Sequence, residues 1–252
     1  NGSVKKVQDI VEDDTLMGDD STPRKVLTLG GGRDTMYKIT HNISKRSYIT
    51  NSEHILTLIG HDNIILEIEV KDFYKFPDHV RSQYRGYSNA IEFSNGPLSA
   101  SDAFLDGKEF NLACRIPDMQ KTAPMKYRIA FLSGLVEQMG IYNTSHVQLF
   151  PGNDNIIEDV MFIINSLGFT ASVDVVNNIK IITIKGNITT IKFPEMYKSL
   201  CSKEEISIEE LSEDNYYGFT LNGNRRFVLG NMIVTHNTRF IRALGKTLNT
   251  PF

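Results

Sequence analysis

Short apolar segments, rich in β-branched residues and separated by Gly, Asn and Asp, fill the first 95 residues of the chain. Segments of this kind are typical of strands bounded by turns, so the pattern predicts an all-β region. Residues 95–107 are turn-rich and weakly patterned, and we expect a domain boundary there. The predicted strands are residues 4–10, 24–29, 36–40, 46–50, 54–59 and 63–70.

The pattern changes over residues 96–202. It predicts an apolar helix, an amphipathic helix with an acidic first turn, a strand between them, and a hairpin with an Asn-Asn turn. These elements alternate as they do in α/β structures, so this part of the chain reads as an α/β module inside a β chain. They are the helices 127–140 and 154–168, the strand 146–150, and the hairpin around Asn177 and Asn178.

A β pattern returns near the end of the chain. Residues 203–212 are acidic and predict a linker or short helix, and residues 216–237 predict a hairpin with turns at Asn222-Gly223 and Gly230-Asn231. Residues 238–252 then predict a basic amphipathic helix. A β domain that is interrupted, resumed and followed by an unrelated helix is explained by insertion of one gene product into another.

Composition narrows the possible classes. The chain has 252 residues, enough for one large domain or two modest ones, and a net charge of −3 that does not favour a polyanion-binding protein. No apolar run approaches the roughly 18 residues that cross a bilayer. Cys114 and Cys201 lie far apart, so we expect two buried core thiols and a reducing, cytoplasmic compartment. We expect no cofactor and no metal site.

The segment from Tyr216 to Asn237, YYGFTLNGNRRFVLGNMIVTHN followed by Thr238, resembles the last two sequence blocks of inteins, which are self-splicing protein domains. The resemblance is specific because a hairpin ends in His-Asn and a hydroxyl residue follows at once. It implies a mostly β fold, the horseshoe-like all-β Hint splicing domain, interrupted by a small α/β insert. The Hint domain would comprise residues 1–95 and 203–237, and residues 238–252 would belong to the host protein.

The chemistry of splicing explains the residue types at this junction. The side-chain amide of Asn237 can attack its own main-chain carbonyl and close a succinimide, which breaks the following peptide bond; positioning favours such an intramolecular attack. His236 can protonate the leaving amine and stabilise charge on the carbonyl oxygen. Thr238 offers the hydroxyl that would accept the upstream segment as an ester before Asn237 cyclises.

A second resemblance concerns Asn51 and His54 in the segment SYITNSEHILTLI. Inteins typically carry Thr-x-x-His here, and its His polarises the upstream scissile peptide. Asn51 replaces the Thr and still offers a hydrogen-bonding side chain. His41 has no such context, and we expect it on the surface of a strand.

Two departures from the intein pattern affect the mechanism. Arg225 stands where many inteins have a His, and Gly218 where they have an Asp, so support for Asn237 would come from Arg225, Arg226 or water. The opening Cys or Ser of inteins is expected about ten residues before the first segment seen here, by typical strand lengths. We therefore expect this chain to lack the N-terminal nucleophile. It could cleave at Asn237, or splice in trans with a short N-terminal peptide.

The segment from Arg115 to Tyr142 resembles the LAGLIDADG homing endonucleases, in which a helix packs on its twin and presents an acid to Mg²⁺. The metal-binding acid of the motif falls at Met139, which cannot bind a hard cation, and Glu137 takes the other acidic position. We expect the second motif copy, after residues 97–107, to be deleted. Residues 97–201 hold nine Lys or Arg and ten Asp or Glu, a balance unsuited to clamping DNA. The sequence therefore predicts a degenerate endonuclease insert at 96–202, with an unrelated α/β module as the alternative.

The tail resembles the first helix of an AAA+ ATPase, such as a Lon-type protease or a clamp loader, if Thr238 ends a P-loop. Three functions remain open. They are splicing with the chain's own flanking segments as partners, site-specific DNA cleavage, and binding of a short N-terminal peptide as half of a split intein. DNA binding and a membrane association are not expected.

Overall fold

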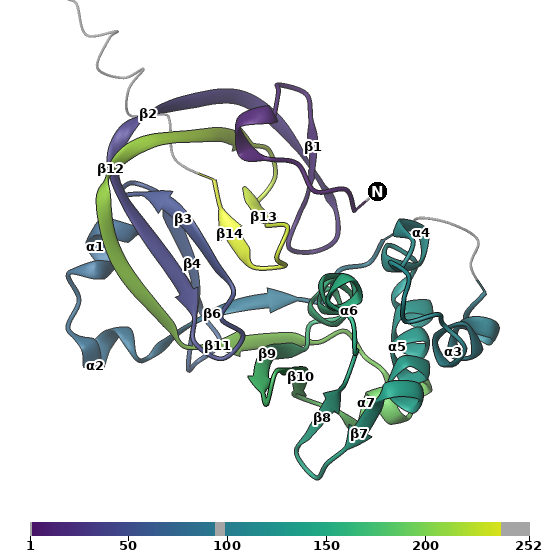
Figure 1. Ribbon diagram of the computed structural model, residues 1–252. Coiled ribbons are helices and arrows are strands. Elements are labelled where there is room, and N and C mark those ends of the chain that lie inside the picture. The colour runs from purple at the N-terminus through teal and green to yellow at the C-terminus, as the bar shows by residue number, and fades with distance from the viewer. Residues whose placement is uncertain (1, 94–98, 238–252) are drawn as a thin grey trace, which may run out of the picture. The chain divides into compact units, whose positions relative to one another are not determined.

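The computed structural model describes residues 2–93 and 99–237, which form two compact units. The β unit contains Val4–Asn42, Arg46–Tyr87 and the described chain from Lys203 onward. The α/β unit contains the described part of Ser88–Ser202, together with short segments at the start of the chain and at Ile43–Lys45. Strands outnumber helices (Figure 1), so the prediction of a mostly β chain with an α/β insert is confirmed.

The β unit is built from short strands around one long ribbon. Two of its strands, β6 and β11, also carry the chain out to the α/β unit and back. Its helical turns are η1 (Val7–Asp9), α1 (Val70–Tyr74) and α2 (Asp78–Arg81). Its strands are β1 (Thr15–Met17), β2 (Pro23–His41), β3 (Ser47–Asn51), β4 (Ile55–Gly60), β5 (Ile65–Glu69), β6 (Tyr84–Asn89), β11 (Cys201–Glu204), β12 (Ile206–Leu221), β13 (Arg226–Val228) and β14 (Val234–His236).

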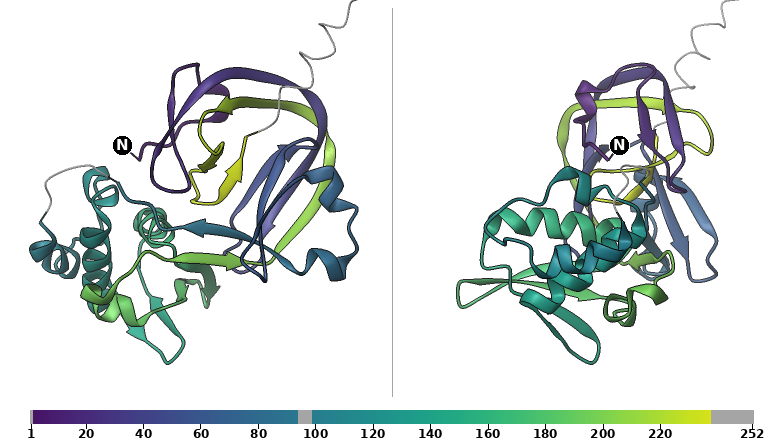
Figure 2. Two further views of the ribbon diagram at one scale, coloured as in Figure 1. Left: turned by 180° about the vertical axis from the view of Figure 1, so that it is seen from behind. Right: turned by 90° about the vertical axis from the view of Figure 1, so that its right-hand side faces the viewer.

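The ribbon consists of β2 and β12, which pair antiparallel from Ile206↔His41 to Leu221↔Val26. Figures 1 and 2 show the two strands side by side as they curve around β13 and β14. The prediction of a linker or short helix at residues 203–212 is therefore wrong. The pairing with β2 lies far away in sequence and outweighs the local acidic composition, while Ile206 and Ile208 alternate onto the core side as a strand requires.

Two small cores stabilise the β unit. One lies between β2, β4 and α1, and the other lies under the ends of the ribbon, where Phe219 and Phe227 pack edge to face with ring centroids 5.1 Å apart. Burial of such side chains is the main source of stability for short strands. The first core contains Tyr37, Ile39, Leu56, Leu58, Val70 and Phe73, and the second contains Ile10, Val26, Phe219, Leu221 and Phe227.

Three further predictions for individual segments are wrong. Residues 4–10 contain the turn η1 instead of a strand. His41 is buried, because β2 brings it against the buried Glu204, with His41 Nδ1 and Glu204 Oε1 3.6 Å apart. Cys114 and Cys201 are both exposed, since each lies in a segment that the cores do not cover.

The α/β unit contains a four-stranded antiparallel sheet of order β7-β8-β10-β9. The predicted helices, the strand near 146 and the hairpin are all present, and Asn177 and Asn178 adopt the positive φ angles of 51° and 64° that a tight hairpin turn needs. Its elements are α3 (Ala100–Lys108), α4 (Asp118–Lys121), α5 (Met125–Met139), β7 (Gly140–Tyr142), β8 (His146–Leu149), α6 (Asp154–Ser166), β9 (Thr170–Val176), β10 (Ile179–Lys185), α7 (Thr189–Lys192) and η2 (Pro194–Met196).

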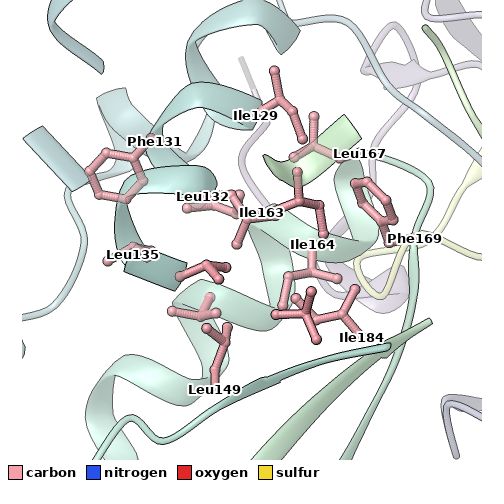
Figure 3. Close-up of a cluster of buried hydrophobic side chains, with 14 of the residues drawn as sticks. Ile129, Phe131, Leu132, Leu135, Leu149, Ile163, Ile164, Leu167, Phe169 and Ile184 are labelled. Atoms are coloured by element: carbon pink, nitrogen blue, oxygen red, sulfur yellow. The ribbon is translucent and has the colours of Figure 1, made fainter. Parts of the chain in front are cut away.

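Helices α5 and α6 fill the core of this unit. Figure 3 shows Ile129, Leu132 and Leu135 of α5 facing Ile163 and Ile164 of α6, with side chains of the sheet below them. All of these residues are almost fully buried, so the core is continuous from helix to sheet.

Helix α3 packs closely on α5, which the sequence did not predict. A Cβ atom at Gly134 would overlap the main-chain oxygen of Phe104, and one at Gly107 would overlap that of Phe131. The turn-rich composition of residues 95–107 hid this helix, because its stability comes from packing against α5 rather than from helix propensity.

No helix within residues 2–93 and 99–237 is long and apolar enough to cross a membrane. The same residues contain no group of three or more His, Cys, Asp or Glu side chains that could hold a metal ion.

Candidate active site

The strands β13 and β14 form the hairpin that ends at the candidate junction. Its register pairs Arg226 with His236, and its turn is closed by hydrogen bonds from Leu229 N to Ile233 O (2.9 Å) and from Met232 N to Leu229 O (2.8 Å). The hairpin places His236 and Asn237 in the interior of the β unit, only 5% and 4% exposed. Such burial is unusual for polar residues at the end of a hairpin and indicates a constrained site.

Asn237 is held by two hydrogen bonds to the main chain. Its amide N–H donates to Arg225 O at 3.2 Å, and its side-chain Nδ2 donates to Phe219 O at 3.1 Å. Phe219 lies on β12, so the long ribbon fixes the orientation of the side-chain amide. A fixed amide is what an intramolecular attack on the neighbouring carbonyl requires.

His236 contacts the carbonyl group that this attack would use. Its Nδ1 lies 2.7 Å from the main-chain oxygen of Asn237, and the N–H donates to that oxygen. Burial lowers the pKa of His236 below its ordinary value, and the positive charges of Arg225 and Arg226 act in the same direction. The Asn237 carbonyl and the carboxylate of Glu67 oppose this shift in the pKa. The ring thus polarises the carbonyl of the bond between residues 237 and 238.

Glu67 on β5 links His236 to Arg226. The Arg226 Nε and Nη2 atoms each lie 2.8 Å from Glu67 Oε1, and the His236 Nε2 lies 3.9 Å from Glu67 Oε2. Glu67 was not predicted from the sequence, because nothing in its local pattern differs from an ordinary exposed strand position.

His54 contacts the strand that ends at the candidate junction. Its Nε2 is 2.7 Å from the hydroxyl of Thr235, which is fully buried. Burial, followed by the charge of His236, lowers the pKa of His54 to about 3, so its ring is neutral at physiological pH. Burial also raises the pKa of Tyr48 to about 12. The segment 51–54 and the last strand are therefore joined through buried, uncharged groups.

Asn51 is buried but lies apart from this contact. Its Nδ2 donates to Asp34 Oδ2 at 3.2 Å, and its main-chain oxygen accepts a hydrogen bond from His54 N at 3.2 Å. Ser52 donates to the same carboxylate from its hydroxyl at 2.7 Å. Asn51 therefore shapes the turn that presents His54.

The other residues predicted for the site are Arg225, Arg226 and Thr238. Arg225 contributes its main-chain oxygen, at a positive φ of 64°, while Arg226 contributes its guanidinium. Thr238 and the predicted tail helix lie outside the described residues. The sequence did not predict the contributions of Thr235 and the Phe219 carbonyl, because main-chain oxygens and common hydroxyl residues carry no sequence signal.

Residues 1–70 match the family model described as Hom_end-associated Hint. The first part of the chain is therefore similar to a Hint domain. The match covers β1 to β5, and so includes Asn51, His54 and Glu67. It ends before the hairpin that carries His236 and Asn237.

Two solved structures are similar over most of the chain. One is the crystal structure of gp41-1 intein, 12% identical, with a TM-score of 0.34, over 92% of this chain and 87% of that one. A substituted form of gp41-1 intein is 14% identical, with a TM-score of 0.33 and the same coverage. Scores this low support no argument about the present chain. None of the curated proteins compared by sequence matches it.

Proposed function

We propose that this chain is a splicing domain that breaks the peptide bond after Asn237 by cyclisation of the Asn237 side chain. The observation that carries the proposal is the hydrogen bond of 2.7 Å from His236 Nδ1 to the main-chain oxygen of Asn237. A buried imidazole aimed at the carbonyl of one Asn is an arrangement that stabilises charge on that oxygen.

The covalent step is balanced within the chain. Asn237 Nδ2 attacks the main-chain carbon of Asn237 and loses a proton, while the bond from that carbon to the nitrogen of residue 238 breaks. The leaving nitrogen gains a proton and becomes a free amine. His236 stabilises the negative oxygen of the intermediate and supplies the proton for the leaving amine.

In full splicing, the Thr238 hydroxyl would first accept the upstream flanking segment as an ester. Release by Asn237 would then free the joined flanking segments for an ester-to-amide shift, which is downhill. His54 and Asn51 would serve the upstream junction, His54 as the polarising group and Asn51 through the turn that presents it. The flanking segments, or a short N-terminal peptide in a split arrangement, are the partners in this proposal.

The α/β unit has a feature that favours an endonuclease ancestry. The close packing of α3 on α5 through Gly107 and Gly134 supports the paired helices that the LAGLIDADG resemblance implies. An active metal site is not supported. Met139 is buried and apolar, and Asp106 accepts a hydrogen bond from Tyr127 at 2.7 Å. We propose that the insert is inactive as a nuclease, and that residues 238–252 begin an ATP-binding host segment.

The test is release of residues 238–252 from the purified chain, followed by mass spectrometry. We expect release from the unsubstituted chain and none from Asn237→Ala, which removes the attacking nitrogen. Asn155→Ala, at an exposed position of α6, is the matched control and should release the tail at the unsubstituted rate. Release that persists in Asn237→Ala would show that another group breaks the bond.

A further inference from the structure

The carboxylate of Glu67 lies between the side chains of Arg226 and His236 in the β13–β14 hairpin. Its Oε1 accepts hydrogen bonds from Arg226, and its Oε2 faces His236 Nε2 at 3.9 Å. The other ring nitrogen of His236 donates to the Asn237 carbonyl. One nitrogen of the imidazole is therefore hydrogen-bonded at the bond to be broken, and the other faces a carboxylate.

The groups around His236 differ in how they affect its charge. Arg225 precedes β13 and Arg226 lies on it, and both disfavour a proton on the ring. His54, at the start of β4, is neutral and adds no charge. Glu67 on β5 favours the protonated ring, as an opposite charge at this distance does.

Arg226 also fixes the position of the carboxylate. Its main-chain N–H donates to Asn224 Oδ1 at 3.1 Å, and its Nη1 lies 3.8 Å from Asp19 Oδ2. Glu67 is anchored from the other side by β5, where it pairs with Thr57 of β4. A carboxylate held in this way loses little freedom when the imidazole becomes charged.

We propose that Glu67, anchored by Arg226, is the positioning residue that orients His236 toward the scissile carbonyl and stabilises its protonated form during cleavage. This inference rests on the proposed function. The sequence left open whether Arg225, Arg226 or water supports Asn237. In this proposal the support comes from Glu67 on β5 together with Arg226 on β13.

The direct test measures the protonation of His236 in the full chain by NMR, in an Asn237→Ala background where no tail is released. A His236→Gln variant assigns the signal. We expect Glu67→Gln to move the His236 midpoint to lower pH, because the amide has no charge to offset Arg225 and Arg226. Glu67→Asp should give a His236 midpoint between that of Glu67→Gln and that of the protein with Glu67 intact. Glu69→Gln is the matched control, since Glu69 lies on the same strand and pairs with Lys71 at 2.9 Å.

A midpoint in Glu67→Gln equal to that in Glu69→Gln would overturn the inference. If Glu67→Gln fails to fold, the His236 midpoint of Glu67→Asp is compared with that of the protein with Glu67 intact. Equal midpoints would again overturn the inference.

The second readout is the pH profile of tail release with Asn237 intact. The unsubstituted rate should fall as the pH rises through the His236 midpoint, because the protonated ring is the acid. In Glu67→Gln the falling limb should move to lower pH, with release roughly tenfold slower near neutral pH, a fraction of what a general acid contributes. An unchanged pH profile in Glu67→Gln would refute the role of Glu67 but not the proposed function. Absence of release from the unsubstituted chain would refute the proposed function, while the NMR titration would still decide on Glu67.

Discussion

The environment of Asn237 separates it from another asparagine that could cyclise. Asn222 precedes Gly223, so no neighbouring side chain hinders attack there, but its Oδ1 accepts a hydrogen bond from Lys25 N at 2.8 Å and the residue is exposed. At Asn237 the side-chain nitrogen is oriented by Phe219 O and the carbonyl is polarised by His236. In the proposed reaction, the contacts of Asn237 and not its sequence neighbours would therefore select the residue that cyclises.

Thr235 provides the first prediction at this scale. Its hydroxyl is buried and lies 2.7 Å from His54 Nε2, so Thr235→Val keeps the shape and removes this hydrogen bond. We expect a loss of about 1–3 kcal/mol in the free energy of unfolding, because the buried ring of His54 loses its hydrogen-bond partner. Urea denaturation measures this loss.

Thr28→Val is the control for Thr235→Val, since Thr28 is exposed and bonds Thr220 on the surface of the ribbon. Its effect should stay within about 0.5 kcal/mol. Equal effects of the two substitutions would show that the buried hydroxyl at position 235 is not a stabilising link.

At the scale of elements, the sequence predicted the helices and hairpins whose turn and capping residues lie within the element itself. The hairpin at Asn177 and Asn178, helix α6 with its Asn153 cap, and the turns of the last hairpin all carry turn or capping residues at the required places. His54 and His236 were identified because their motifs are local too. Their contact through Thr235 follows from a chain path that no single segment encodes.

The sequence did not predict the elements that depend on partners far away in the chain. Residues 206–212 form a strand because β2 pairs with them, and residues 100–108 form a helix because α5 packs on them. Local composition pointed to a linker in the first case and to a boundary in the second. Glu67 was missed for the same reason, since its role arises from β13 and β14 and not from β5.

The packing of α3 on α5 gives a prediction for an element. Gly134→Ala adds a methyl group that would overlap the main chain of α3 at Phe104 and Lys108. Although Ala has the higher helix propensity, we expect a net loss of about 1–3 kcal/mol, because the helices must move apart. Glu137→Ala, at an exposed position of the same helix, should have little effect, and the two are compared by urea denaturation. Stabilisation by Gly134→Ala would contradict the close approach of the helices.

At the scale of the molecule, the chain leaves and re-enters the β unit through neighbouring strands. β6 and β11 are hydrogen-bonded neighbours in one sheet, and Ala90 N donates to Leu200 O at 2.8 Å. The two ends of the α/β unit therefore lie close together, as is usual where one domain is inserted into another.

This closeness predicts that the α/β unit is dispensable for cleavage. Replacing residues 91–199 with a short Gly-containing turn should leave tail release within a few-fold of the full chain, because Phe219, Arg225 and Glu67, which contact His236 and Asn237, belong to the β unit. Release rates and circular dichroism of the shortened chain test this. A folded but inactive shortened chain would mean that the α/β unit takes part in the reaction.

The central claim is that Asn237 cyclises. Its most direct test is the mass of the fragment ending at Asn237 immediately after tail release. A fragment one water lighter than the free acid, with the loss located at Asn237 by fragmentation, is the succinimide that the account predicts. A fragment that carries a free carboxylate from the outset, with water-derived oxygen in it when release is run in labelled water, would show simple hydrolysis and contradict the account.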